Sequence, residues 1–572
     1  MRNRSKVHSS VVAPRLHGDR GRNAGLTDDG GYVLALTALL MLPLLAFTGY
    51  AVDLGAWYAR AGQIQRAADA SALAGARYMP NFGRAEPAAR EVATKNGFTD
   101  NPAAGISVQV QAVAANPSQL KVVIQDDRVG QYFSKLFRSN VTISRPATAE
   151  LIRPIPMGSP RNFLGTGDRI AASTGVRDNY WLSVSGYCAR REMGDRMTPR
   201  SDANGGDSSG GVFQGCVPGV NGVVANPEYT ADGYFYAIEF SGAGSGSWYT
   251  QLYDAPHCQF EGSTAGDSGA ENSTSARRYT YILRDKDRPD DPTQARILYQ
   301  QTVSPASCST MAGRWVNFGP AFSGSQVSTP GTYYLQIKPV VPTSTGPGNN
   351  QQEGQNQFGL RVNNAGSTGD SFYRCSADRS VDVPGAPYSA SCPQVYGLTH
   401  LGVYANLVGT RPSFFLASIE PQYNNHTLEV ELFDPAEGAL GIELLDPNGT
   451  PVTFTWEIAC ADGAYQSETG QACTTGENAP QGGYGPGTTN YKDVSGTVSN
   501  AQRTWGSRNI QNGKYSDRLL RLKYKLPADI AAAYGGNTWW KIRYTVASSG
   551  LGDRTTWSVI VKGDPVRLVP NA

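Results

Sequence analysis

Two short motifs in this chain carry the residue types of a serine hydrolase. Gly206–Gly210 reads GDSSG and formally matches G-x-S-x-G, a pattern that needs a strand before the serine and a helix after it. The surrounding SDANGGDSSGG is rich in turn residues instead. His257 in PHC and Ser268 in GDSG have the form of trypsin-like motifs, but they stand too close together to come from two different barrels. We therefore predict no catalytic residue and no enzyme.

Metal-binding patterns are also scarce. Three histidines lie outside the N-terminal tail, His257, His400 and His426. The chain has no H-E-x-x-H and no C-x-x-C, so a zinc site is not expected. Residues 284–291 read RDKDRPDD and could hold calcium, but they lack the glycine and the distal glutamate of an EF-hand loop. A solvated loop is the favoured interpretation. We expect no metal, no cofactor and no small-molecule substrate.

Eight cysteines form an even set that lies far beyond the hydrophobic segment described below. They are Cys188, Cys216, Cys258, Cys308, Cys375, Cys392, Cys460 and Cys473. Disulfides in an oxidising compartment are expected, with buried free thiols as the alternative. The simplest of the 105 possible connectivities joins neighbours, 188–216, 258–308, 375–392 and 460–473.

The whole-chain composition narrows the class of protein. With 572 residues, the chain is too long for a single core. Its 50 Lys and Arg nearly balance 48 Asp and Glu, so nothing points to nucleic acid. The 65 Gly, 35 Pro, 29 Tyr and 9 Trp are typical of short strands joined by many turns.

One segment is long enough to cross a membrane. Residues 30–52 contain no charge, and as a helix they would extend about 34 Å, against a hydrocarbon core of about 30 Å. The preceding residues 1–29 have a basic excess, which predicts a disordered tail in the cytoplasm. A cleaved signal peptide is the competing interpretation, because Gly49-Tyr50-Ala51 loosely matches a small-x-small cleavage site.

The helix is expected to continue through residues 53–80 with a face of small side chains. Candidates for contact with another helix are Gly55, Ala67, Ala68, Ser71, Ala72, Gly75 and Ala76. Stacking at four-residue spacing would let a second helix approach closely. The alternative is an alanine-rich stalk that reflects helix propensity alone.

The run from Asp29 to Arg77 resembles the N-terminal segment of TadE/TadG-like Flp pilus-assembly proteins. The resemblance lies in the apolar segment, AVDLG at 51–55, Tyr58, Gln65 and AADASALAGA at 67–76. It implies a pilin-like α/β unit after the long helix, and helix contacts with other pilus-assembly membrane proteins. No G-x-x-x-x-E processing signature is present at the membrane entry, where Leu36 follows Gly31 five residues later, which favours the unprocessed, TadG-like type. The D-x-S-x-S of a von Willebrand type A domain is absent too.

Residues 81–153 fit such a unit, with a helix at 88–97, strands at 106–113, 120–125 and 141–151, and a short helix at 131–137. Beyond it we expect two antiparallel β-sandwiches, residues 154–393 and 394–572. Predicted strands include 234–241, 248–254, 278–284, 331–339, 357–362, 414–421, 427–435, 453–458, 518–527, 539–546 and 555–563. The strands at 331–339 and 357–362 are expected to form a hairpin. Trp539, Trp540 and Trp557 are expected in the core, with a binding platform as the alternative.

Together these observations predict an α+β and all-β, multidomain chain: a transmembrane helix with a helical extension, a pilin-like unit and two β-sandwich-like domains. The expected function is a non-enzymatic, TadG-like, membrane-anchored component of Flp pilus assembly or of a cell-envelope surface structure. Its N-terminus would be cytoplasmic and its C-terminal region extracytoplasmic. The alternative is a surface adhesin, or a protein that binds glycan or cell wall, on a Tad-like anchor.

Overall fold

The computed structural model describes most of the chain. It covers residues 30–165, 179–201, 224–253, 278–341, 355–364, 391–407, 412–433, 439–459, 519–546 and 551–569, with small internal gaps, and a few isolated positions and short strands elsewhere. The basic tail, both hydrolase-like motifs and Cys216, Cys258, Cys460 and Cys473 lie outside the described residues.

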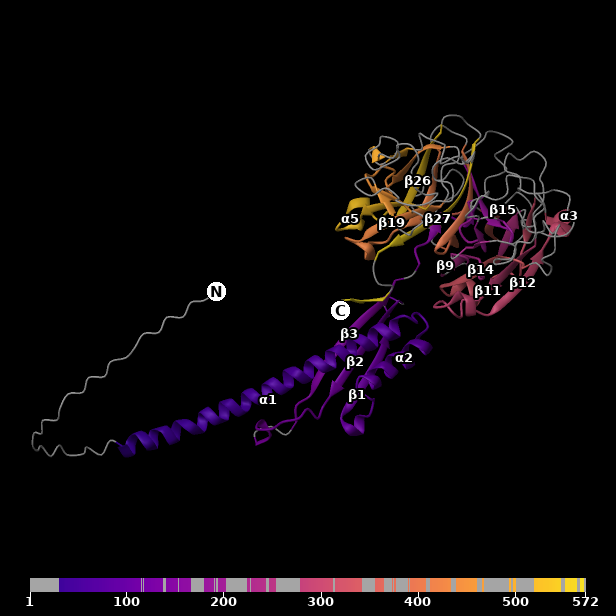
Figure 1. Ribbon diagram of the computed structural model, residues 1–572. Coiled ribbons are helices and arrows are strands. Elements are labelled where there is room, and N and C mark those ends of the chain that lie inside the picture. Colours follow the sequence, from indigo (N-terminus) through magenta and orange to yellow (C-terminus); the bar gives the residue numbers. More distant parts are fainter. Residues whose placement is uncertain are drawn as a thin grey trace, which may run out of the picture. The chain divides into compact units, whose positions relative to one another are not determined.

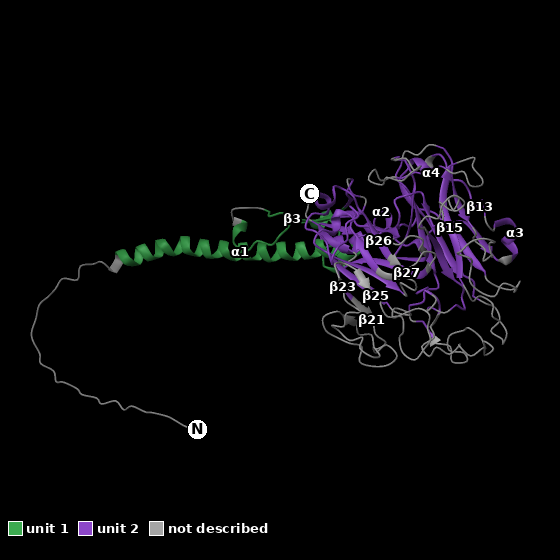
Figure 2. Cartoon of the chain, turned by 90° about the horizontal axis from the view of Figure 1, so that it is seen from above, with its two compact units in different colours: residues 1–71, 90–110, 122–147 green, residues 72–89, 111–121, 148–572 purple. Residues whose placement is uncertain are grey.

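The chain divides into two compact units, coloured green and purple in Figure 2. The first comprises residues 1–71, 90–110 and 122–147, and the second comprises residues 72–89, 111–121 and 148–572. The division cuts crosswise through helix α1 (Gly30–Ala76) and the strands that follow it, so these elements contribute to both units.

Helix α1 is continuous over 47 residues, which corresponds to about 70 Å. Leucine and alanine dominate its sequence, and both are strong helix formers. Pro43 lies inside the helix. In the second half, buried residues recur every three or four positions, at Ala61, Ile64, Ala68, Ala72 and Ala76. This spacing places one face of the helix against the folded chain.

A small α/β unit follows, as predicted. Helix α2 (Phe82–Lys95) starts six residues earlier than expected, and strands β1 (Ile106–Ala112), β2 (Gln119–Asp126) and β3 (Ile143–Leu151) lie within two residues of their predicted bounds. The expected helix at 131–137 is a single 3-10 turn, η2 (Ser134–Leu136). The sheet has the order β1-β2-β3-β28, because the C-terminal strand β28 (Val566–Val569) pairs antiparallel with β3.

Two eleven-stranded sheets make up most of the second unit. One has the order β13 (Trp315–Asn317), β10 (Trp248–Tyr253), β15 (Gln355–Asn364), β6 (Asn179–Ser185), β17 (His400–Leu407), β27 (Leu551–Val561), β19 (Thr427–Phe433), β25 (Leu519–Lys525), β21 (Thr455–Ala459) and β22 (Tyr465–Ser467), with β5 (Phe163–Leu164) beside β15.

The other has the order β12 (Ile297–Val303), β11 (Tyr279–Arg284), β14 (Gly331–Pro339), β9 (Tyr234–Phe240), β16 (Gln394–Gly397), β4 (Met157–Gly158), β18 (Ser413–Ser418), β26 (Trp539–Val546), β20 (Ala439–Leu445), β24 (Thr497–Ser499) and β23 (Asp493–Val494). Strands β9, β14, β11 and β12 can be followed side by side in Figure 1.

The two sheets pack face to face over one hydrophobic core. Aromatic rings from the two sheets contact each other in this core. The ring centroids of Tyr281 on β11 and Phe358 on β15 are 5.9 Å apart, and those of Phe414 on β18 and Trp557 on β27 are 6.1 Å apart. Trp540 and Trp557 are fully buried and Trp539 nearly so, which confirms the prediction that they belong to the core. Edge-to-face and tilted ring pairs of this kind stabilise a core beyond their buried area.

Two expectations about this region differ from the structure. Neither sheet breaks at residue 393, because β17 pairs with both β6 and β27, and β4 pairs with both β16 and β18. Pairing these strands removes the exposed edges that two separate sandwiches would leave unpaired. The expected hairpin is also wrong. Strands β14 and β15 belong to opposite sheets.

Candidate functional site

The first half of α1 is apolar and uncovered. Among residues 32–52, every position except Gly49 is exposed, including Leu42 at 71% and Phe47 at 73%. In the described part of the chain, α1 is the one helix long and apolar enough to cross a membrane, by length and composition. A continuous exposed apolar stretch of this size is typical of a surface that a membrane or a protein partner covers.

Asp53 ends this apolar stretch and is completely buried. Its carboxylate accepts three consecutive backbone N–H groups, from Tyr132 at 2.8 Å, Phe133 at 2.9 Å and Ser134 at 2.5 Å. Burial alone would raise the pKa of Asp53, but the hydrogen bonds from Ser134, Tyr132 and Phe133 outweigh it and lower the pKa to about 2. The carboxylate therefore stays charged at any physiological pH and fixes the loop before η2 to the helix.

Two further polar side chains of α1 hold the helix to other elements of the first unit. Arg60 forms an ion pair with Asp126 on β2 at 2.6 Å, and its guanidinium lies 4.6 Å from the ring centre of Phe98. Gln65 donates one hydrogen bond to the carbonyl of Pro146 on β3 and another to Asp69. Tyr58, the aromatic residue of the Tad-like pattern, is exposed instead.

The small-residue face of α1 is covered by the chain itself. Ala67, Ala68, Ser71, Ala72, Gly75 and Ala76 are all buried. A Cβ atom on Gly75 would lie 2.8 Å from the carbonyl oxygen of Ala85 and 2.9 Å from the Cβ of Ala89, both on α2. A contact with a helix of another protein was expected on this face; at Gly75 the helix that approaches is α2 of the same chain. Gly55 is exposed, with open space around it.

The described cysteines form disulfides. Cys375 and Cys392 are bonded to each other, as neighbour pairing predicts. Cys188 and Cys308 are disulfide-bonded as well. Disulfides of this kind persist in oxidising compartments.

The acidic loop at 284–291 uses its carboxylates within the protein. Asp290 pairs with Arg84 of α2, and Asp285 pairs with Arg296. Asp291 caps a 3-10 turn by accepting the N–H of Thr293. The expected solvated loop is thus in part an ion-paired one, and no cluster of metal-ligating side chains occurs among the described residues.

A buried ion network crosses the first large sheet. Glu431 on β19 accepts hydrogen bonds from Arg196 at 2.8 Å and from Arg521 at 2.7 Å. Burial would raise the pKa of Glu431, but the two arginines lower it. Burial and the charge of Arg196 lower the pKa of nearby His400 to about 4, against the opposing charges of Glu431 and Glu228. Through Glu431, this network joins the loop that contains Arg196 to the neighbouring strands β19 and β25.

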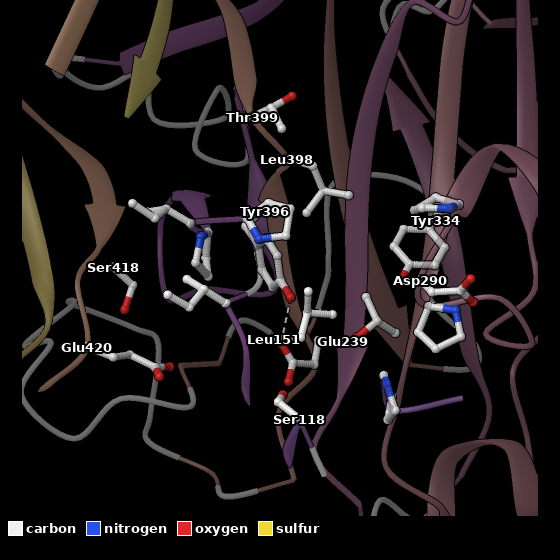
Figure 3. Close-up of a pocket in the computed structure, with 18 of the residues that line it drawn as sticks. Ser118, Leu151, Glu239, Asp290, Tyr334, Tyr396, Leu398, Thr399, Ser418 and Glu420 are labelled. Atoms are coloured by element: carbon white, nitrogen blue, oxygen red, sulfur yellow. Dashed lines mark hydrogen bonds between the residues drawn. The ribbon is translucent and has the colours of Figure 1, made fainter. Parts of the chain in front are cut away.

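The second unit also contains a cavity of about 1370 Å³. Figure 3 shows the hydroxyl of Tyr396 on β16 directed at Glu239 on β9, to which it donates at 2.7 Å. Glu150, Asp290 and Glu420 add further carboxylates to the lining. Tyr334 and Tyr396 are largely buried, so their rings form walls of the cavity more than open platforms.

Asp53 and the loop it binds were missed by sequence reasoning. The available signal was a lone acidic residue directly after 23 uncharged ones, where an unpaired carboxylate would be costly. Such a residue needs a partner, but the sequence does not say which loop supplies it.

Comparison with known proteins agrees with this reading of α1. Residues 31–77 match the family model Tad, described as "Putative Flp pilus-assembly TadE/G-like". No significant match to the chain was found among curated proteins or among solved structures. The matched segment spans the exposed apolar half of α1, Asp53 and the whole small-residue face. Residues 31–77 of this chain are therefore similar to the Tad segment of TadE/G-like Flp pilus-assembly proteins.

Proposed function

We propose that the protein is a TadG-like, non-enzymatic component of Flp pilus assembly, anchored in the membrane by the first half of α1. The observation that carries the proposal is the Tad match on a helix whose residues 32–52 are exposed and apolar. A helix of this length satisfies all its own backbone groups and can cross the hydrocarbon core.

The second half of α1 would then act as a rigid spine outside the membrane. Its small-residue face is buried, at Gly75 against α2 and Leu120 of β2, so contacts with other pilus-assembly proteins would use surfaces that remain open. Gly55 and Tyr58, on the exposed turns just beyond Asp53, are the candidates. The basic excess of the tail supports a cytoplasmic N-terminus, and the disulfides support an extracytoplasmic location for the β-rich unit.

Affinity purification of the full chain from native membranes tests this function. We expect Tad-type secretion or pilus components to co-purify, and a deletion strain to lose pili. Recovery of none of these components, together with normal piliation in the deletion strain, would contradict the proposal.

A second function, binding of glycan or cell-wall polymer, draws support from the cavity. Carboxylates and a tyrosine hydroxyl along one wall, such as Glu239 and Tyr396, have the donor and acceptor chemistry that sugars use. If this function holds, the full chain should sediment with purified peptidoglycan, and Glu239→Gln should weaken that binding. Equal binding by the variant would argue against the cavity as a site.

A further inference from the structure

The loop held by Asp53 presents exposed aromatic side chains. Tyr132 is 72% exposed and Phe133 is 52% exposed, and Lys135 beside them is exposed too. Large apolar rings left open at the tip of a loop need an explanation, because a soluble surface rarely retains them in a cluster.

Their position along α1 supplies that explanation. The ring of Phe133 packs directly on the helix backbone, since a Cβ on Gly49 would lie 2.8 Å from Phe133 Cγ. Gly49 is the one covered position in the apolar run of residues 32–52. It lies four residues before Asp53, about 6 Å along the helix axis. The loop therefore reaches past the charged end of the run and lies against its apolar part.

The backbone N–H groups at the loop tip have an acceptor within the protein and do not depend on water for their hydrogen bonds. A chain that enters the interface of a bilayer cannot leave its N–H groups without acceptors. Asp53 accepts from three successive ones, at Tyr132, Phe133 and Ser134. The Asp53 carboxylate thus accepts the hydrogen bonds of the N–H groups at the loop tip, and it fixes the position of the loop along the axis of α1.

We propose that residues 131–136 form a second membrane contact, in which Tyr132 and Phe133 insert among the phospholipids at the interface of the leaflet facing the folded chain. Aromatic rings favour this layer of the bilayer, and the Lys135 ammonium can reach lipid phosphates while its stem stays apolar. The contact is continuous with the apolar surface of α1, and it would fix the depth and the rotation of the helix. The inference rests on the proposed membrane anchor at residues 30–52.

Site-specific photo-crosslinking tests the contact. The full chain, reconstituted in vesicles of phosphatidylethanolamine and phosphatidylglycerol, would carry benzoylphenylalanine at Tyr132, at Leu40 or at Tyr299. Leu40 reports insertion of the helix, and Tyr299 is an exposed tyrosine on β12 in the other unit. We expect phospholipid adducts by mass spectrometry at Tyr132 and Leu40 and none at Tyr299. Asp53→Ala should reduce the Tyr132 adduct several-fold and leave the Leu40 adduct unchanged.

The outcomes separate the inference from the function on which it rests. Adducts at Leu40 without adducts at Tyr132 would overturn the loop contact and leave the anchor standing. Absence of lipid adducts at Leu40 would overturn both. A Tyr132 adduct to a second protein chain would assign the aromatic pair to a protein interface instead. An undiminished Tyr132 adduct in the Asp53→Ala variant would refute the role of this carboxylate in holding the loop.

Discussion

Substitution of Gly75 by alanine probes the packing of α1 on α2. In an open helix, Gly→Ala stabilises by about 1 kcal/mol. Here the new methyl would collide with Leu120 Cδ2 on β2 and would lie 2.8 Å from the Ala85 oxygen and 2.9 Å from the Ala89 Cβ, well inside the 3.5–4.0 Å that carbon contacts prefer. The Leu120 side chain can change its rotamer, but the Ala85 oxygen is a backbone atom and the Ala89 Cβ is fixed to the backbone, so relief of these two contacts requires α1 and α2 to move apart.

Overpacking of this kind costs about 1–3 kcal/mol. Set against the gain of about 1 kcal/mol in helix propensity, this cost leaves a net loss of up to about 2 kcal/mol, a factor of up to roughly 30 in the opening equilibrium. Gly62→Ala on the same helix is the matched control, since its nearest neighbour is the Arg66 side chain at 3.5 Å.

Hydrogen exchange of the full chain in detergent or nanodiscs measures this effect locally, which suits a chain of two units. Amides of α2 should exchange faster in Gly75→Ala, by a factor of up to roughly 30, and no faster in Gly62→Ala. Equal protection of α2 in the two variants would refute the close packing, and with it the reassignment of the small-residue face to a contact within the chain.

Three further predictions concern the second unit. His400 binds a proton below about pH 6.5 when unfolded and only below about pH 4 when folded, so unfolding takes up a proton between these values. Stability should therefore fall by up to roughly 3 kcal/mol as pH falls through this window, and the thermal midpoint of His400→Gln should depend less on pH. Glu431→Gln should destabilise by about 1.5–3 kcal/mol, the range for hydrogen bonds to a charged group, because Arg196 keeps Glu228 and Arg521 keeps Glu429; calorimetry should show no change for Glu91→Gln, which breaks an exposed pair with Lys95. Replacing Cys375 and Cys392 by serine should cost about 2–4 kcal/mol, and both native thiols should resist alkylation until the chain is reduced.

Local sequence pattern predicted where elements lie far better than it predicted their partners. Strand β14 has its expected bounds and β26 likewise, because alternating aromatic and branched residues mark a strand wherever it pairs. The pairing of β17 with β6 joins residues more than 200 positions apart, and no short-range signal specifies it. The hairpin expectation for β14 and β15 failed for the same reason.

The candidate site was predictable to a similar degree. The uncharged run and the Tad pattern identified α1, and its small face led us to expect a helix of another protein, whereas at Gly75 the neighbouring helix is α2. The neighbour was identifiable in principle: α2 carries Ala85, Ala89 and Ala93 at four-residue spacing, and all three are buried. The role of Asp53 was not, since its partners are backbone groups of a loop about 80 residues away.

Cysteine labelling in whole cells tests most directly whether α1 crosses the membrane with its folded part outside. A membrane-impermeant maleimide would be applied to single variants Gln63→Cys, on an exposed turn of α1, and Ser9→Cys, in the basic tail, with the unsubstituted chain as background. We predict labelling of Gln63→Cys in intact cells and of Ser9→Cys only after the membrane is permeabilised. The reverse order, or equal labelling of both variants in intact cells, would contradict the anchored topology.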